Sequence, residues 1–302
     1  MTPLPAPLVV DLVGRSLTRI TDLTAAELEA ILDRADELKA LHAAREPHRL
    51  LEGRALGLLF RKHSTRTRVS LEVAIAQLGG VAVPLQPEEL QLSRGETLAD
   101  TARVLSRYLD AIAVRTHPQA EVDELAAAAS IPIVNALTDD AHPLQALADL
   151  QTIRERFGTL DGIRVAWVGD GSNVCVSLAE ACALLDVELV AASPAGYEAV
   201  GAETIRDPRE AANGAHVLVT DVWASMGQED ERDRRAADLQ PYALDGELLA
   251  LADPDAIVLH CLPAHPGEEI AADVLYGPQA AVWDEAENRL HTSKALLSLV
   301  CG

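Results

Sequence analysis

The sequence lacks three features that would point to whole classes of protein. Basic residues are outnumbered, with 25 Lys and Arg against 47 Asp and Glu, and the formal charge of -22 argues against nucleic acid and anionic membranes as main partners. No stretch approaches ~18 uninterrupted apolar residues, so we expect no membrane span. The four cysteines form no Cys-x-x-Cys pair and have no metal-like spacing with histidine, which predicts free thiols, a reducing compartment and no metal site.

The length and the N-terminus narrow the class further. A chain of 302 residues is long enough for two domains, and 49% hydrophobic residues allow each a full core. Residues 1–7 have neither the charged region nor the long apolar run that open a signal peptide. We therefore expect a soluble, cytoplasmic protein.

Strand-like apolar segments alternate with helical patterns in two series along the chain. The first series has strands at Ala55–Phe60, Val81–Leu85, Ala111–Arg115 and Ile131–Leu137, with helical patterns at Thr97–Leu109 and Gln119–Ala129. The second has strands at Arg164–Gly169, Val187–Ser193, His216–Val222 and Ala256–Leu262. This alternation predicts an α/β fold of two doubly wound parallel sheets, each covered on both faces.

Two further helical patterns set the expected domain boundaries. The segment His142–Phe157 predicts a helix that bridges the two domains, and Trp283–Val300 predicts a C-terminal helix that packs back on the first. Near the N-terminus, Thr24 and Glu27 form a capping box at the start of another helix. We expect one domain at residues 1–141 together with 286–302, and the other at 142–285.

A basic window follows the first predicted strand. The run Ser64–Arg68 opens a helical pattern that stops at Gly79, and no Asp or Glu occurs between Glu52 and Glu72. Free N–H groups and the positive end of the helix dipole favour a phosphate at a helix N-terminus, and arginines add charge-assisted hydrogen bonds. The window predicts a phosphate site. The alternative is an ordinary N-cap followed by solvent-facing arginines.

Polar residues also follow the other predicted strands, where open α/β sheets bind ligands. They are Arg115, His142, Gln145, the turn 169–173, Asp221 and Cys261. The Gly169-Asp170-Gly171 turn does not complete a dinucleotide fingerprint, because Val174 stands where the next glycine is required. A thiol hydrolase dyad of His260 and Cys261 requires that the strand has already ended, because adjacent strand residues point to opposite faces.

The segment Ala224–Arg235 differs from the other connections. It is longer, carries many charges and directly follows a strand end. We expect a loop there, which is either a lid over a ligand or a solvated charged loop.

Four motifs in combination resemble the aspartate/ornithine carbamoyltransferase family. They read FRKHSTRTR at 60–68, HPLQ at 142–145, DVWASMG at 221–227 and HCLP at 260–263. The first two are shared with the aspartate branch, and the last two look like the ornithine branch. The resemblance covers nearly all of the chain. It implies transfer of the carbamoyl group of carbamoyl phosphate to the side-chain amine of ornithine, giving citrulline and phosphate, without a cofactor, by a homo-oligomer such as a trimer.

The resemblance also implies roles for individual residues. The carbamoyl phosphate set is Ser64, Thr65, Arg66, Thr67, Gln91 (from a neighbouring subunit), Arg115, His142, Gln145, Cys261, Leu262 and Arg289. The ornithine set is Asn173, Asp221, Ser225 and Met226, and the catalytic set is Arg115, His142, Cys261 and Arg289. Two residues depart from the family pattern, since Arg61 stands where Glu is common and Ser172 where Asn is common.

Two classes of alternative remain open. One is a transcarbamoylase that acts on aspartate, putrescine or an acylated ornithine, although Asp221 and Cys261 fit a cationic amine better than a second carboxylate. The other is a non-catalytic carbamoyl-phosphate-binding or assembly subunit. The presence of Arg115, His142 and Cys261 argues against it.

Overall fold

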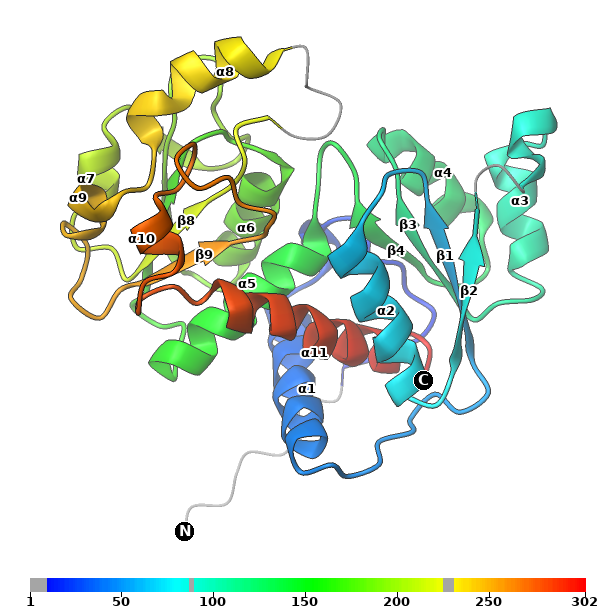
Figure 1. Ribbon diagram of the computed structural model, residues 1–302. Helices are drawn as coiled ribbons and strands as arrows, with labels where there is room; N and C mark the ends of the chain where they lie inside the picture. The colour runs from blue at the N-terminus through cyan, green and yellow to red at the C-terminus, as the bar shows by residue number, and fades with distance from the viewer. Residues whose placement is uncertain (1–9, 87–89, 225–230) are drawn as a thin grey trace. The chain divides into compact units, whose positions relative to one another are not determined.

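The chain divides into two compact units. The computed structural model describes residues 10–86, 90–224 and 231–302 (Figure 1). The first unit consists of Met1–Asp139 and Arg289–Gly302, and the second of Asp140–Asn288. Within the described ranges, no helix is both long and apolar enough to cross a membrane.

A four-stranded parallel sheet in the order β2-β1-β3-β4 forms the centre of the first unit. The elements in chain order are η1 (Ile20–Asp22), α1 (Ala25–Ala43), β1 (Ala55–Phe60), α2 (Thr65–Gln77), β2 (Val81–Leu85), η2 (Gln91–Arg94), α3 (Leu98–Leu105), β3 (Ala111–Arg115), α4 (Gln119–Ala128) and β4 (Ile133–Leu137). Thr24 and Glu27 form the predicted capping box at the start of α1. The end of α11 (Val282–Val300) also lies in this unit, where the N–H of Gly14 donates to the carbonyl of Val300 at 2.9 Å.

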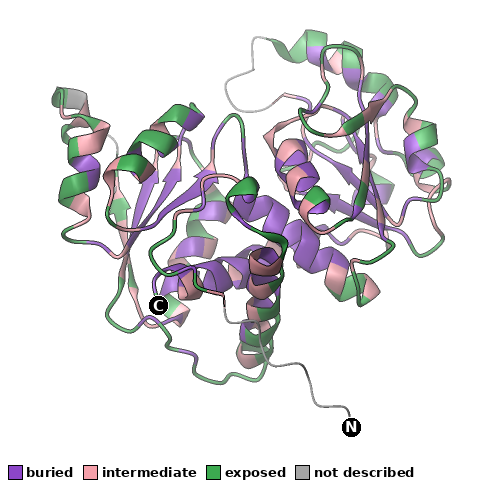
Figure 2. Ribbon diagram, turned by 180° about the vertical axis from the view of Figure 1, so that it is seen from behind, coloured by how far each residue is buried: buried purple, intermediate pink, exposed green. Residues whose placement is uncertain are grey.

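The strands of this sheet are apolar because both faces are covered. In β3, Ile112 and Val114 join Val122 and Leu125 of α4 in one core cluster. Helices α3 and α4 pack together on that face, and α2 lies on the other (Figure 1). Burial is therefore nearly continuous along β1, β3 and β4, whereas the edge strand β2 is partly exposed. The outer faces of the helices are exposed (Figure 2).

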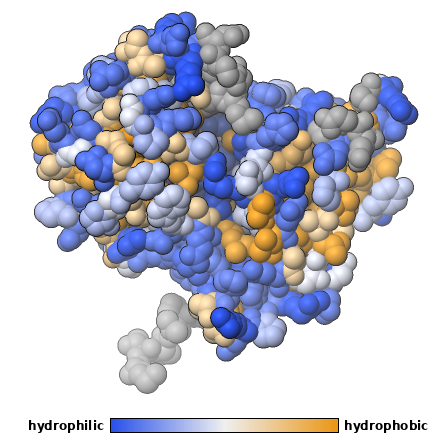
Figure 3. Space-filling view, viewed as in Figure 1, coloured by the Kyte–Doolittle hydropathy of each residue, from blue (hydrophilic) through white to orange (hydrophobic). Residues whose placement is uncertain are grey.

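An exposed apolar patch lies over α2 and β2 (Figure 3). Its large side chains are Val69, Val73 and Val81, which are 47%, 36% and 58% exposed. We call these three residues the valine patch. Apolar side chains that gather on a surface in this way favour contact with another protein surface.

The second unit contains a five-stranded parallel sheet in the order β7-β6-β5-β8-β9. Its elements are α5 (Pro143–Phe157), β5 (Arg164–Val168), α6 (Asn173–Leu184), β6 (Glu188–Ala192), β7 (Glu203–Ile205), α7 (Pro208–Ala212), β8 (Val217–Thr220), α8 (Arg232–Leu239), η4 (Gln240–Tyr242), α9 (Gly246–Leu249), β9 (Ile257–His260), α10 (Ala272–Leu275) and the start of α11. Alternate β5 residues Ala166 and Val168 pack with α7, α9 and α10. Helices α5 and α6 pack against each other.

The predicted fold class, two parallel-sheet α/β domains, is confirmed, but several local boundaries were wrong. The loop expected over Ala224–Arg235 ends earlier, because Arg232 begins α8. The helix expected over Thr97–Leu109 ends at Leu105, and the strands of the second sheet are shorter than their apolar runs. Apolar residues that flank a strand are buried in turns as well, so hydrophobicity alone overestimates strand length.

Candidate active site

Each sheet has one topological switch point. In the first sheet, the chain continues from β1 to β2 on one side and from β3 to β4 on the other. The switch point therefore lies between β1 and β3. By the same criterion the second sheet switches between β5 and β8. Because connections diverge there, the carboxyl ends of these strands leave a crevice, which is the usual ligand site of open α/β sheets.

The N-terminus of α2 lies beside the switch point of the first sheet. Ser64 is its N-cap, and its Oγ accepts from the N–H of Thr67 at 3.2 Å. The first turn contains no acidic residue. A cavity of about 390 Å³ is lined by Ser64 and Thr65 together with the cationic side chains of Arg61, Lys62 and Arg68. The dipole and these charges make the cavity favourable for an anion.

Most cations of this window are paired with carboxylates. Lys62 pairs with Asp139, Arg61 with Glu121, and Arg68 with Glu72 one turn later. The charge of Arg61, the residue that departs from the family pattern, is therefore neutralised by Glu121 of α4. Arg66, half-buried, has no ion-pair partner among the residues that the structure describes, which leaves its charge available to an anion.

Arg289 of α11 approaches the same helix N-terminus. Its guanidinium donates to Oγ1 of Thr67 at 3.0 Å, and both side chains are buried. At the switch point itself, the carbonyl of Arg115 accepts from the N–H of Arg61 at 2.8 Å and so ties the end of β3 to the end of β1. The predicted carbamoyl phosphate residues Ser64 to Thr67, Arg115 and Arg289 thus belong to one unit. Gln91 is exposed at the start of η2.

Asp221 is the centre of the site in the second unit. It follows β8 and is 5% exposed. Its Oδ1 accepts from the N–H of Val222 at 2.8 Å and from Sγ of Cys261 at 3.1 Å, and its Oδ2 accepts from Oγ of Ser172 at 3.1 Å. The Ser172 bond crosses the β5–β8 switch point. Serine at this position therefore still supports Asp221, and Asn173 follows as the first residue of α6.

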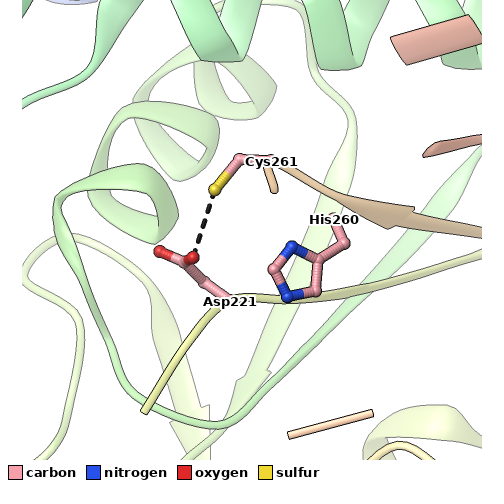
Figure 4. A group of neighbouring side chains, drawn as sticks. All are labelled: Asp221, His260 and Cys261. Carbon is pink, nitrogen blue, oxygen red and sulfur yellow. Dashed lines mark hydrogen bonds between the residues drawn. The ribbon is translucent and has the colours of Figure 1, made fainter. Parts of the chain in front are cut away.

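Cys261 is a protonated hydrogen-bond donor. Burial, and then the negative charge of Asp221, raise the pKa of its thiol well above the usual range. In Figure 4 the hydrogen bond runs from Cys261 to Asp221 and none joins His260 to either. The strand does end at His260, but both ring nitrogens are used elsewhere, with the N–H of Leu262 and with Glu269. A thiolate–histidine dyad is therefore ruled out by this geometry.

The same hydrogen bonds decide against a metal ligand set. One ligand atom each of Asp221, His260 and Cys261 lies within 4.8 Å of the others. A metal needs a free imidazole lone pair, whereas Nδ1 of His260 accepts from the N–H of Leu262 and Sγ of Cys261 donates to Asp221. The group is better described as the Asp221 carboxylate with the Cys261 thiol hydrogen-bonded to it.

A buried ion pair lies beside Asp221. Arg235 of α8 pairs with Asp170, donates to the carbonyl of Trp223 and stacks over the ring of Tyr197 at 4.9 Å. Burial raises the pKa of Asp170 to about 6, with Asp221 adding to the effect and Arg235 opposing it. This pair fastens the start of α8 to the turn after β5.

His142 and Gln145 are held within the second unit. His142 occupies the N-cap position of α5, and its backbone N–H donates to Oγ of Ser177 at 2.8 Å. Nε2 of Gln145 donates to Asp149 and to Glu285, each at 2.7 Å. The other oxygen of Glu285 accepts from the N–H of His260 at 2.8 Å.

Glu285 was missed by sequence reasoning. Its carboxylate joins Gln145, which lies 140 residues earlier in the sequence, to the end of β9. No local pattern marks Glu285, because a carboxylate in the first turn of a helix looks like a dipole partner. Ser225 and Met226, predicted to bind ornithine, lie outside the described residues. Leu262, also predicted, has a left-handed backbone with φ of 58°.

Two parallel α/β units with polar groups at their switch points define a two-domain protein that binds a ligand in each unit. Residues 15–155 match the family model described as "Aspartate/ornithine carbamoyltransferase, carbamoyl-P binding domain". Residues 161–300 match "Aspartate/ornithine carbamoyltransferase, Asp/Orn binding domain". The chain therefore belongs to the aspartate/ornithine carbamoyltransferase family, and the resemblance inferred from the motifs is confirmed.

Individual relatives are similar over nearly their full length. The chain is 54% identical over 297 residues to the ornithine carbamoyltransferase of Parafrankia sp., covering 93% of this chain and 94% of that protein. It is 48% identical over 311 residues to a Pyrococcus furiosus protein named "Ornithine carbamoyltransferase, anabolic", covering 98% and 99%. The solved structure of the ornithine carbamoyltransferase from Pyrococcus furiosus superposes with a TM-score of 0.94, covering 97% of this chain and 99% of that one.

Proposed function

We propose that this protein is an ornithine carbamoyltransferase, which transfers the carbamoyl group of carbamoyl phosphate to the side-chain amine of L-ornithine and releases L-citrulline and phosphate. The relatives that match over nearly the full chain carry this name. The observation that carries the choice of amine is the buried Asp221 carboxylate, held by Ser172 and Cys261. It offers a negative charge to an ammonium group, whereas aspartate would require a cation for its second carboxylate.

The first unit binds carbamoyl phosphate in this proposal. The phosphate accepts from the N-terminus of α2, from the Ser64 and Thr65 hydroxyls and from Arg66. Thr67, Arg115 and Arg289, with His142 and Gln145, serve the carbamoyl end. Gln91 reaches the site of a neighbouring subunit.

The reaction is attack of the neutral amine of ornithine on the carbamoyl carbon. Negative charge builds on the carbamoyl oxygen, where Arg115 and His142 are the donors, and then on the departing phosphate, where Arg66 is the counter-charge. The C–N bond forms first and the C–O bond to phosphate then breaks, and the amine proton leaves with the phosphate or to solvent. Holding two substrates in register supplies up to roughly 7–11 kcal/mol in favourable systems.

The second unit binds ornithine. Asp221 pairs with the α-ammonium, Asn173 together with Ser225 and Met226 completes the amine site, and Cys261 and Leu262 line the reaction centre. A protonated thiol suits this position, because it donates a hydrogen bond without competing as a nucleophile for the carbamoyl carbon.

We also propose that the chain forms a homo-oligomer, most simply a trimer, in the cytoplasm. The valine patch over α2 and β2 supports an interface, since such a surface is stabilised when it is covered. All four cysteines are free, which suits a reducing compartment.

One assay tests the activity and its main rivals. The purified protein is incubated with carbamoyl phosphate and, separately, with ornithine, aspartate, putrescine or N-acetylornithine, and the carbamoylated products are quantified. We expect citrulline with a kcat/KM at least about 100-fold above that of any rival, the size of discrimination that a charge-specific site provides. Preference for another amine would reassign the substrate, and binding of carbamoyl phosphate without any product would indicate the non-catalytic alternative.

A further inference from the structure

The turn that follows β9 has an unusual backbone. Leu262 has φ of 58°, a left-handed conformation that non-glycine residues rarely adopt. Such a residue persists only where its surroundings hold it in place. Cys261 precedes it directly, so whatever holds Leu262 also determines where the Cys261 thiol points.

The support for Leu262 comes from the last residue of the strand. The N–H of Leu262 donates to Nδ1 of His260 at 2.9 Å. The other ring nitrogen, Nε2, lies 3.1 Å from Oε1 of Glu269, and His260 and Glu269 are both fully buried. Since Nδ1 accepts a proton from a backbone amide, the ring proton must be on Nε2, where it is donated to the carboxylate.

Glu269 is suited to select that tautomer. Burial raises its pKa, but the hydrogen bonds from His260 and from the N–H of His265 outweigh burial, so the pKa of the carboxyl group is lowered and the group is an anion. An anionic acceptor favours the ring that carries its proton on Nε2. The N–H of His265 lies 2.5 Å from the same carboxylate, so Glu269 also holds the far end of the turn.

We propose that His260 and Glu269 are positioning residues for the carbamoyl transfer: together they hold the Leu262 turn so that the Cys261 thiol is directed at Asp221. The inference rests on the proposed function for its kinetic consequence only. Both side chains are fully buried and hydrogen-bonded to protein atoms, so the pair acts on turnover through the geometry of the turn.

Two substitutions at His260 separate this role from simple packing. His260→Asn keeps an acceptor near the position of Nδ1 and loses the reach to Glu269, whereas His260→Gln keeps the reach and loses the acceptor for Leu262. Both remove the ring, so each controls for packing in the other. We expect His260→Gln to lower kcat for citrulline formation about 10- to 100-fold with the KM for carbamoyl phosphate unchanged, and His260→Asn to retain the larger part of kcat.

A matched pair at Glu269 tests the tautomer argument. Glu269→Gln retains an acceptor for Nε2–H, whereas Glu269→Met has similar length and none. We expect Glu269→Gln to rescue most of the kcat that Glu269→Met loses. Equal loss in His260→Asn and His260→Gln, or equal loss in Glu269→Gln and Glu269→Met, would overturn the proposal.

A readout without turnover keeps the inference independent of the proposed function. The rate at which iodoacetamide alkylates Cys261, followed by mass spectrometry, reports whether the thiol remains bonded to Asp221. We expect slow alkylation in the wild type and His260→Asn, and at least about fivefold faster alkylation in His260→Gln, with thermal unfolding as the control for folding. If the wild type forms no citrulline, the proposed function is wrong. If His260→Gln leaves the alkylation rate of Cys261 unchanged, the positioning role is wrong, whatever the activity of the wild type.

Discussion

At the scale of single residues, Arg66 is the half-buried cation of the basic window that has no ion-pair partner among the described residues. We expect Arg66→Ala to weaken binding of carbamoyl phosphate about 10- to 150-fold, since a charge-assisted hydrogen bond contributes roughly 1.5–3 kcal/mol. Calorimetric titration measures the loss. Arg54→Ala is the matched control, because Arg54 is exposed, is paired with Asp110 and does not line the cavity, and equal losses in the two variants would contradict the assignment.

Asp221 gives a second prediction at this scale. Asp221→Asn keeps the shape and loses the charge, so we expect the KM for ornithine to rise at least about tenfold while the affinity for carbamoyl phosphate stays within twofold. Steady-state kinetics and calorimetry measure the two effects. The exposed Asp161 supplies the control Asp161→Asn. A parallel loss of both substrates together with thermal stability would mean that Asp221 only caps the turn at Val222.

Lys294 gives a prediction about pH. It is fully buried, and burial lowers the pKa of its ammonium group to about 8. Nζ lies 3.2 Å from Nε2 of His48, whose Nδ1 is paired with the carbonyl of Glu46 at 2.8 Å. The unfolded chain holds the lysine proton up to its ordinary pKa of ~10.4, so between about pH 8 and that value the unfolded state binds more protons and stability rises with pH.

We therefore expect the free energy of unfolding of wild type, relative to Lys294→Met, to rise between pH 8 and 10 by at most about 1.4 kcal/mol per pH unit. Urea denaturation at a series of pH values measures the slope. Lys39→Met on α1 is the control and should leave the slope unchanged. A difference between wild type and Lys294→Met that is flat with pH would show that the folded and unfolded pKa values are alike.

At the scale of elements, Arg235 provides the buried polar attachment of α8, while Arg232 and Asp238 form exposed contacts with Glu268 and Tyr197. Arg235 pairs with Asp170 and donates to Trp223. Arg234 is exposed, and its ion-pair partner among the described residues is Glu231, three positions earlier. We expect Arg235→Leu to speed hydrogen exchange across 232–239 at least about tenfold and to leave Pro208–Ala212 (α7) unchanged. Arg234→Leu, one residue earlier, should change neither segment. Exchange unaffected in both variants would mean that packing, rather than the ion pair, holds α8.

The sequence predicted elements well where apolar runs were bounded by turn residues. The strands β1, β2 and β3 begin and end where the pattern placed them. It missed β7, because one exposed and two half-buried residues form no apolar run. It read the start of α8 as loop, because the charges there resemble a solvated segment. The buried partner of Arg235 is 65 residues away, and no local pattern reports such a distance.

Site residues divide in the same way. Ser64, Arg66 and Asp221 were recognisable because they follow strand ends and carry motif identity. Glu285 and Glu269 were not, because their partners Gln145 and His260 are brought near by the fold. The residues that we propose to contact ligands therefore leave a sequence signature, whereas those that hold them in place are seen only in three dimensions.

At the scale of the whole molecule, the valine patch predicts self-association. We expect the native mass by light scattering to be three times the 32.2 kDa chain mass. Val73→Glu should shift the mass toward the monomer, since it places a charge in the covered apolar surface. Val104, 45% exposed on α3, provides the control Val104→Glu. A monomeric wild type would exclude the trimer.

The two switch points belong to separate sheets with separate cores. This separation has a consequence for how the substrate preference of the protein can evolve or be engineered. Substitutions in the turn 169–173 or around Asp221 alter the proposed amine site through contacts that stay within the second unit. The basic window at 61–68 belongs to the first unit, which has a core of its own. Mutations that change the amine substrate therefore need no compensating mutations among the residues proposed to bind phosphate. A library confined to the turns after β5, β8 and β9 should yield transferases for new amines that all still consume carbamoyl phosphate.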